Sequence, residues 1–176
     1  PQFFEQKRDI RILLEHKVTT LDTAQKQVMV NQKQAIGYDR LIICTGASPA
    51  SIDLPGSNSG NVFSFWNVTD TVNVKTFIQQ NHPRKALIVG AGSIGLLMAE
   101  TFHSLGIGVT IIEMADRILG EYEPEITDIM SQLLDQNHIQ VFLSSRLTSF
   151  KGKGGAGAVE AAVLQDQQMV NLPMDM

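Results

Sequence analysis

The chain has 176 residues, of which 43% are hydrophobic and 18% charged, and a formal net charge of −4 at pH 7. This composition is typical of a soluble globular protein with one large or two small domains, and the acidic balance without a basic block argues against nucleic acid and anionic membranes as partners. No apolar run approaches the roughly 20 residues of a membrane span, the N-terminus lacks a signal-peptide pattern, and the single cysteine allows no internal disulfide.

The first part of the chain predicts an antiparallel meander followed by a buried strand. Three short β-prone runs are separated by polar turns, namely Ile10–Leu14, Lys17–Leu21 and Gln27–Val30. The apolar run Leu41–Cys44 then predicts a buried strand, in which Cys44 is a packed core thiol. Thr45 and Gly46 follow, where the chain leaves the sheet and can approach a ligand closely.

A domain boundary is expected near residue 56. The proline and glycine of Leu54-Pro55-Gly56 indicate a turn, and Ser57-Asn58-Ser59-Gly60 has the composition of a linker. We therefore expect one domain over residues 1–56 and a second over residues 57–176, the second beginning with a helix at Val68–Gln80.

The most informative segment runs from Lys85 to Glu113. The apolar residues 86–89 suit a buried parallel strand, and Gly90, Gly92 and Gly95 have the G-x-G-x-x-G spacing of a dinucleotide-binding turn. A helix over Ser93–Leu105 follows, with Gly106 as its stop, and a second strand over Ile107–Ile112. Because the free N–H groups of a helix N-terminus bind anions, the pyrophosphate is expected at the turn formed by Gly90, Ala91, Gly92, Ser93, Ile94 and Gly95.

Glu113 stands at the tip of the second strand, 23 positions after Gly90. A carboxylate there can accept both hydroxyls of an adenine ribose and would repel a 2′-phosphate, so NAD(H) is the expected cofactor rather than NADP(H). Arg117 leaves an alternative open, because a cation just past the acid could contact a 2′-phosphate, although such residues are more often solvated loop residues.

The remaining residues complete an α/β pattern. They predict a helix over Glu123–Asn137, a third parallel strand over Gln140–Leu143, and a second meander over Leu147–Phe150, Ala158–Gln165 and Met169–Leu172 whose hairpin tip, residues 151–157, is mobile. The four histidines have no metal-ligand spacing, and no catalytic grouping is evident. We therefore assign no catalytic and no metal-binding residues.

Three segments resemble the pyridine nucleotide-disulfide oxidoreductase flavoproteins, in particular the branch of NADH oxidases, NADH peroxidases and coenzyme A-disulfide reductases. Residues 38–49, Tyr-Asp-Arg-Leu-Ile-Ile-Cys-Thr-Gly-Ala-Ser-Pro, with Leu54-Pro55-Gly56, resemble the exit from that family's flavin domain. Residues 113–119 resemble the stretch after the second strand of its NADH domain, and Pro1–Glu5 resembles the helix that enters its meander.

The resemblance implies a Rossmann-like parallel sheet with helices on both faces plus antiparallel β-meanders. It implies that residues 1–56 are the trailing portion of an FAD-binding domain, with Thr45 and Gly46 at the flavin, and that residues 57–176 are an NAD(H)-binding domain truncated before its last strand. That strand would lie beside Lys85–Val89, and we expect Asn61–Phe65 or a second copy of the chain to occupy its place. The chain begins at Pro1 rather than Met, which suggests a fragment.

The parent protein implied by the resemblance is a homodimeric enzyme that passes hydride from NADH to FAD and then to a disulfide, peroxide or oxygen; the fragment alone is expected to be inactive. The single cysteine together with the dinucleotide motif suggests the cytoplasm as its compartment. Two alternatives stay open. One is an electron-transfer reductase of the ferredoxin, rubredoxin or nitrite-reductase type. The other is a module that senses NAD(H) without turnover, because Ser93 and Leu97 stand where the family usually has an aromatic residue and a glutamate near the nicotinamide.

Overall fold

The structure is a computed structural model that describes residues 10–49, 53–151, 159–165 and 168–176. Contacts within the chain divide it into two compact units, Pro1–Ala47 and Ser48–Met176, so the division falls before the predicted boundary near residue 56. Most of the predicted hairpin tip and all of Pro1–Glu5 lie outside the described residues. No helix in the described ranges is both long and apolar enough to cross a membrane.

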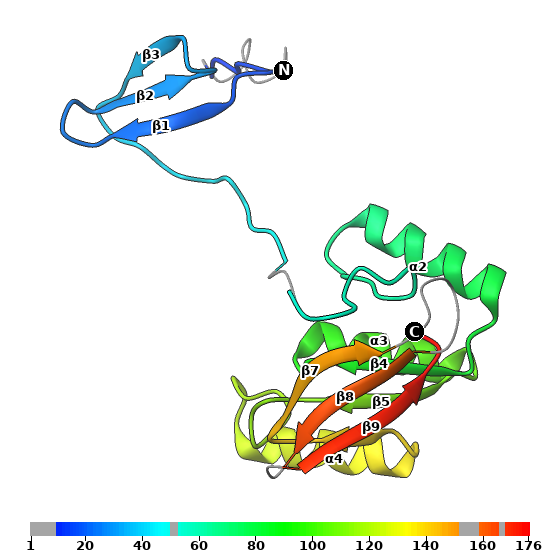
Figure 1. Cartoon of the computed structure of the whole chain (residues 1–176). Coiled ribbons are helices and arrows are strands. Elements are labelled where there is room, and N and C mark those ends of the chain that lie inside the picture. Colours follow the sequence, from blue (N-terminus) through cyan, green and yellow to red (C-terminus); the bar gives the residue numbers. More distant parts are fainter. Residues whose placement is uncertain (1–9, 50–52, 152–158, 166–167) are drawn as a thin grey trace. The chain divides into compact units, whose positions relative to one another are not determined.

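The first unit contains a three-stranded antiparallel sheet of β1 (Val18–Asp22), β2 (Gln27–Val30) and β3 (Gln34–Gly37), as Figure 1 shows. The prediction of a strand at Ile10–Leu14 is wrong, because the third strand of the meander is β3, which follows β2 in the chain. The reason is local: Asn31 and Gln32 both adopt positive φ, which closes a tight hairpin and aligns Val30 with Gln34. Asparagine tolerates this conformation better than most residues.

The buried strand expected at Leu41–Cys44 is also wrong, because this segment is irregular and exposed. Ile42 and Ile43 are 84% and 66% exposed, and Cys44 is an exposed thiol rather than a packed one. An apolar run becomes a buried strand only beside other strands, and no strand in the described part of the chain pairs with it. Val30 is the one buried residue among those described in this unit.

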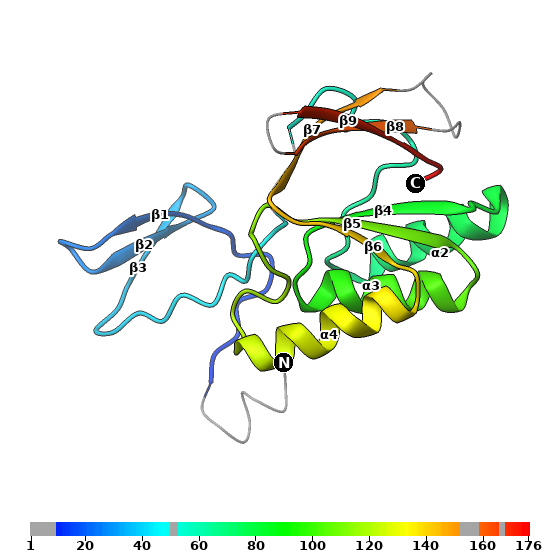
Figure 2. The same cartoon turned by 90° about the horizontal axis from the view of Figure 1, so that it is seen from below.

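The second unit is built on a parallel sheet with the order β4 (Lys85–Val89), β5 (Gly108–Ile112) and β6 (Gln140–Phe142). The strands are connected by α3 (Ser93–Ser104) and α4 (Pro124–Gln136). Connections between parallel strands are almost always right-handed, and these two connections lead across the sheet in the same direction. Both helices therefore lie on the same face of the sheet, as Figure 2 shows. This confirms the Rossmann-like α/β fold.

The opposite face of the parallel sheet is covered by an antiparallel sheet rather than by helices (Figure 2). It consists of β7 (Ser145–Lys151), β8 (Val159–Gln165) and β9 (Gln168–Met174), which correspond to the predicted second meander with longer strands. Ile112 packs on this side with Leu147 and Ala161. The sheet is thus buried on both faces, which explains its nearly continuous apolar strands.

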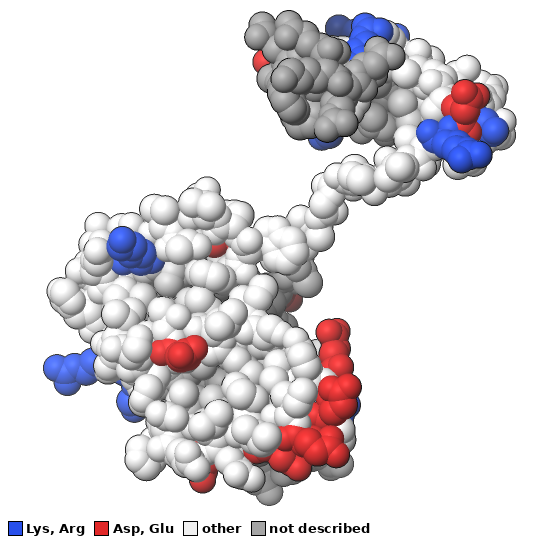
Figure 3. Space-filling model, turned by 180° about the vertical axis from the view of Figure 1, so that it is seen from behind, with Lys and Arg blue, Asp and Glu red and all other residues white. Residues whose placement is uncertain are grey.

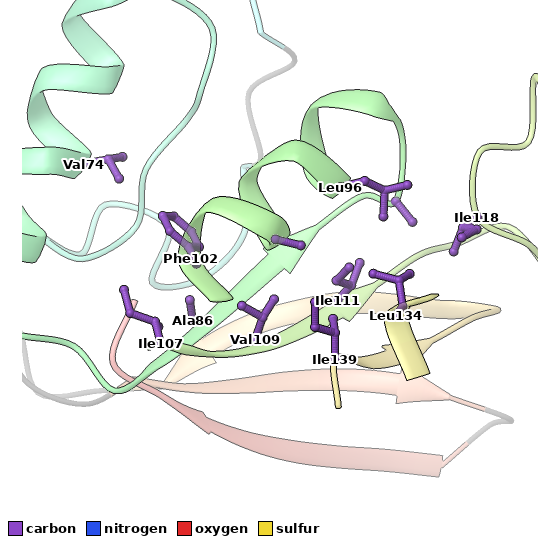
Figure 4. Close-up of a cluster of buried hydrophobic side chains, with 12 residues drawn as sticks. Val74, Ala86, Leu96, Phe102, Ile107, Val109, Ile111, Ile118, Leu134 and Ile139 are labelled. Carbon is purple, nitrogen blue, oxygen red and sulfur yellow. The ribbon is translucent and has the colours of Figure 1, made fainter. Parts of the chain in front are cut away.

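The main core lies between α3, α4 and the parallel sheet (Figure 4). Its buried residues include Ala86, Leu96, Phe102, Val109, Ile111, Leu134 and Ile139. A further helix, α2 (Val68–Asn81), adds Val74 to this core and begins with a capping box between Asn67 and Asp70.

The edge of β4 is occupied in part by the last residues of the chain. The Leu87 N–H donates to the Met176 carbonyl at 2.8 Å, and the Met176 N–H donates to the Lys85 carbonyl at 3.3 Å. This pairing is where we expected Asn61–Phe65 or a second copy, so that expectation is wrong for the Lys85–Leu87 part of the edge. Asn61 instead donates through Nδ2 to the carbonyl of Asp175 at 3.0 Å.

Candidate dinucleotide site

The glycine turn connects the carboxyl end of β4 to the N-terminus of α3, as the spacing predicts. Gly90 has a φ of +105°, a backbone conformation that residues other than glycine rarely adopt. Gly95 lies so close to the turn that a Cβ atom there would be 2.1 Å from the Gly90 carbonyl oxygen. The turn therefore requires glycine at position 90 for its conformation and at position 95 for the close approach of helix and turn.

Gly92 is the N-cap of α3 and leaves the helix N-terminus accessible. Its φ and ψ are −79° and −177°, and no side chain caps the helix. The first intrahelical bond runs from the Leu96 N–H to the Gly92 carbonyl at 3.0 Å, so the N–H groups of the first turn point out of the helix. Nothing lies within 4 Å of where a Cβ of Gly92 would stand. This space and the positive end of the helix dipole suit the pyrophosphate of a dinucleotide.

A cavity of about 840 Å³ extends from the turn along β4. It is lined by Gly90, Gly92, Ser93, Ile94 and Gly95, and by apolar side chains that include Phe63, Ile88 and Met98. A mostly apolar cavity with backbone polar groups at one end has the character of a cofactor pocket.

Glu113 lies beside the turn, at the end of β5, where the sequence predicts it. Its half-buried carboxylate accepts two backbone hydrogen bonds, from the Ala91 N–H to Oε2 at 2.7 Å and from the Ala115 N–H to Oε1 at 2.8 Å. Since each carboxylate oxygen can accept a second bond, the group retains acceptor capacity for ribose hydroxyls. The structure therefore brings together the predicted pyrophosphate and ribose residues.

Arg117 is exposed, and its Nη2 donates to the carbonyl of Gly120 at 2.6 Å. Exposed acidic residues stand close to it in sequence, namely Asp116, Glu121, Glu123 and Glu125. Acidic side chains gather on one part of the surface of this unit in Figure 3. Such a surface disfavours a further phosphate, which agrees with the preference for NAD(H) expected from Glu113.

Two features of the site were not predicted from the sequence. The hydroxyl of Tyr122 lies 3.5 Å from Ser93 Oγ, although the tyrosine comes from the loop before α4. A second cavity, of about 550 Å³, begins at these two residues and continues between α3 and α4 along Leu97 and Leu133. No spacing rule relates Tyr122 to the glycine motif, because the approach depends on how α4 packs beside α3.

Thr45 and Gly46, the predicted flavin contacts, belong to the first unit and are exposed in irregular structure. Their assignment stays a prediction. Among the described residues, no group of three or more His, Cys, Asp or Glu side chains is placed to hold a metal ion.

Comparison with known proteins places the chain in a family. Residues 1–176 match the family model of the pyridine nucleotide-disulphide oxidoreductases. The chain is 30% identical over 164 residues to an NADH oxidase of Methanocaldococcus jannaschii, which covers 90% of this chain and 37% of the relative. It is 31% identical over 156 residues to a coenzyme A disulfide reductase of Staphylococcus haemolyticus, with 86% and 35% covered.

Among solved structures, a ferredoxin reductase of Rhodopseudomonas palustris has the same fold, with a TM-score of 0.80 at 23% identity over 100% of this chain and 42% of that one. The chain thus spans about a third of the length of the curated relatives it matches. With its whole length matched, the chain belongs to the pyridine nucleotide-disulphide oxidoreductase family.

Proposed function

We propose that this chain is the NADH-binding part of an FAD-dependent oxidoreductase. The observation that carries the proposal is the placement of Glu113 against Ala91, which puts a carboxylate at the glycine turn and beside the open N-terminus of α3. When bound, NADH supplies a hydride that FAD accepts, and the electrons go on to a disulfide, peroxide or oxygen. One relative is named an NADH oxidase and another a coenzyme A disulfide reductase, names that agree with this proposal.

The role of the chain's own residues is to bind and orient. The N–H groups at Gly92 and Ser93 would hold the pyrophosphate, and the open space at Gly92 would let it approach the backbone. The carboxylate of Glu113 would accept the ribose hydroxyls. With the adenosine and pyrophosphate held in this way, the cavity beside β4 and α3 would be available to the nicotinamide.

A second candidate function is an NAD(H)-binding module without turnover. It is favoured by Leu97, an apolar side chain that is 61% exposed where the family usually has a glutamate. An electron-transfer reductase is also compatible, since the fold is shared with a ferredoxin reductase. Rapid mixing of NADH with the full-length protein distinguishes these candidate functions. Reduction of the flavin excludes the sensing module. The acceptor that then reoxidises the flavin distinguishes an oxidase or disulfide reductase from an electron-transfer reductase.

We also propose that the parent protein is located in the cytoplasm and forms a homodimer. The compartment is supported by the single cysteine together with the nicotinamide site, and the homodimer by the family resemblance. Light scattering of the full-length protein checks the assembly.

Calorimetric titration of the chain with NADH and NADPH tests the nucleotide assignment. We expect tighter binding of NADH, and we expect Glu113→Ala to narrow the difference by about 1–3 kcal/mol, because the ribose hydroxyls lose their acceptor. Asp135→Ala, which removes an exposed carboxylate from the last turn of α4, is the control and should leave the difference nearly unchanged. Equal affinities of the parent chain for the two nucleotides would contradict the assignment.

A further inference from the structure

Glu113 holds the backbone of the glycine turn as well as standing where a ribose is expected. We propose that Glu113 is a positioning residue, whose carboxylate fixes the peptide of Ala91 and thereby sets the shape of the phosphate-binding turn. The inference rests on the proposed function in one respect only, namely that the turn receives a pyrophosphate.

The backbone of Ala91 is held at both its N–H and its carbonyl group. Its N–H donates to Glu113 Oε2 at 2.7 Å, and its carbonyl accepts from the Leu119 N–H at 3.0 Å. The neighbouring Gly90 N–H donates to the Ile112 carbonyl at 2.8 Å. Ala91 is 1% exposed, so loss of the carboxylate would leave a buried N–H without this acceptor.

Glu113 can act as an anchor because its own backbone is fixed in the sheet. Its N–H donates to the Phe142 carbonyl at 2.9 Å, and its carbonyl accepts from the Ser145 N–H at 2.8 Å. The second carboxylate oxygen accepts from the Ala115 N–H, which closes the first turn of the following loop. That loop contains Leu119, whose φ of +47° is unusual for a bulky side chain and shows that the surrounding contacts impose its conformation.

If Glu113 shapes the turn, removing its carboxylate should change the affinity for pyrophosphate in the opposite direction from that expected of a residue that only binds ribose. Since the Ala91 N–H is already used by Glu113, the phosphate is left to the N–H groups of Gly92 and Ser93. Removing the carboxylate removes a negative charge near the anion, which by itself strengthens anion binding. If the carboxylate also shapes the turn, its removal weakens the binding of an anion that has no ribose at all.

The experiment compares the parent chain with Glu113→Ala, Glu113→Gln and the control Asp116→Ala. The first measurement is amide hydrogen exchange by NMR without added ligand. We expect exchange at Ala91 and Ala115 to accelerate about tenfold in Glu113→Ala. It should accelerate less in Glu113→Gln, which keeps one acceptor oxygen, and should stay unchanged in Asp116→Ala.

The second measurement titrates inorganic pyrophosphate and follows the amide shifts of Gly92 and Ser93. We expect Glu113→Ala to weaken binding about fivefold, whereas Asp116→Ala leaves it unchanged or slightly tighter. Pyrophosphate binding that is as tight or tighter in Glu113→Ala overturns the proposal, and so does unchanged exchange at Ala91. If the parent chain fails to bind NADH while exchange at Ala91 still accelerates, the proposed function fails and the positioning role stands.

Discussion

Gly95 shows at the scale of one residue how packing outweighs helix propensity. Alanine inside a helix is favoured over glycine by about 0.5–1 kcal/mol. At Gly95, however, the added Cβ would meet the Gly90 carbonyl oxygen at 2.1 Å, an overlap that only a backbone shift can relieve. Overpacking of this kind costs about 1–3 kcal/mol, so the steric effect wins.

We therefore expect Gly95→Ala to lower the free energy of unfolding by about 1–2 kcal/mol, measured by urea denaturation. Gly60→Ala is the matched control, because nothing lies within 4 Å of its Cβ position. A Gly95→Ala variant as stable as the parent would mean that the turn and helix are less closely packed than the structure has them.

The residues of the turn could be predicted from the sequence because their roles are local. Within six residues, Gly90 provides a positive φ, Gly92 leaves space for a ligand at the backbone, and Gly95 allows close contact with the turn. Glu113 then follows at the end of the next strand. The neighbour Tyr122 and the bond between the Ala91 N–H and the Glu113 carboxylate could not be predicted, since they depend on packing between elements far apart in the chain.

At the scale of elements, Asp175 fixes the start of β4. One carboxylate oxygen, Oδ2, accepts from the Arg84 N–H at 2.7 Å and from the Lys85 N–H at 2.9 Å. The Asp175 N–H in turn donates to the Lys85 carbonyl at 3.0 Å. The strand is thus tied at one end by Asp175, while the turn at its other end is tied by Glu113.

We expect Asp175→Ala to reduce the free energy of unfolding by about 2 kcal/mol, because two hydrogen bonds to a charged acceptor are lost. Asp175→Asn should reduce it by less, since the amide oxygen can still accept both bonds without the charge. Thermal denaturation of the three proteins measures this order. Equal stability of Asp175→Ala and the parent would show that solvent replaces these bonds at no cost.

The elements of the second unit were predictable because each carries its own periodicity and end signals. The helix predicted at Val68–Gln80 is observed as Val68–Asn81, and that at Glu123–Asn137 as Pro124–Gln136. The first unit was predicted less well for a physical reason. Leu41–Cys44 has the composition of a buried strand, yet a strand requires hydrogen-bonding neighbours that no described residue provides.

At the scale of the whole molecule, the two units differ in how much core they contain. The first has one buried residue, Val30, among those described, whereas the second has two apolar clusters on the two faces of its parallel sheet. Burial of apolar surface is the main stabilising term in folding. The second unit is therefore expected to hold most of the stability of this chain.

The same difference predicts that the chain does not retain flavin. Thr45 and Gly46 lie in exposed irregular structure, which offers too little enclosed surface to offset the cost of immobilising a ligand. We expect the purified chain to be colourless, and added FAD to separate from it on gel filtration. A yellow preparation with the absorption band of bound flavin would place the flavin contacts elsewhere.

The most direct test of a dinucleotide site at the glycine turn is calorimetric titration of the parent chain, Gly92→Asn and Gly92→Asp with NADH. Gly92 has the extended conformation of an N-cap and free space at its Cβ, so both side chains should cap α3 and leave the melting temperature unchanged or slightly higher. Only aspartate adds a negative charge where the pyrophosphate is expected. The account predicts saturable NADH binding to the parent chain, and binding at least about tenfold weaker in Gly92→Asp than in the parent chain. Gly92→Asn, which fills the same space without the charge, should bind no more weakly than Gly92→Asp. Absent NADH binding by the parent chain, or binding by Gly92→Asp as tight as by the parent chain, would contradict the account.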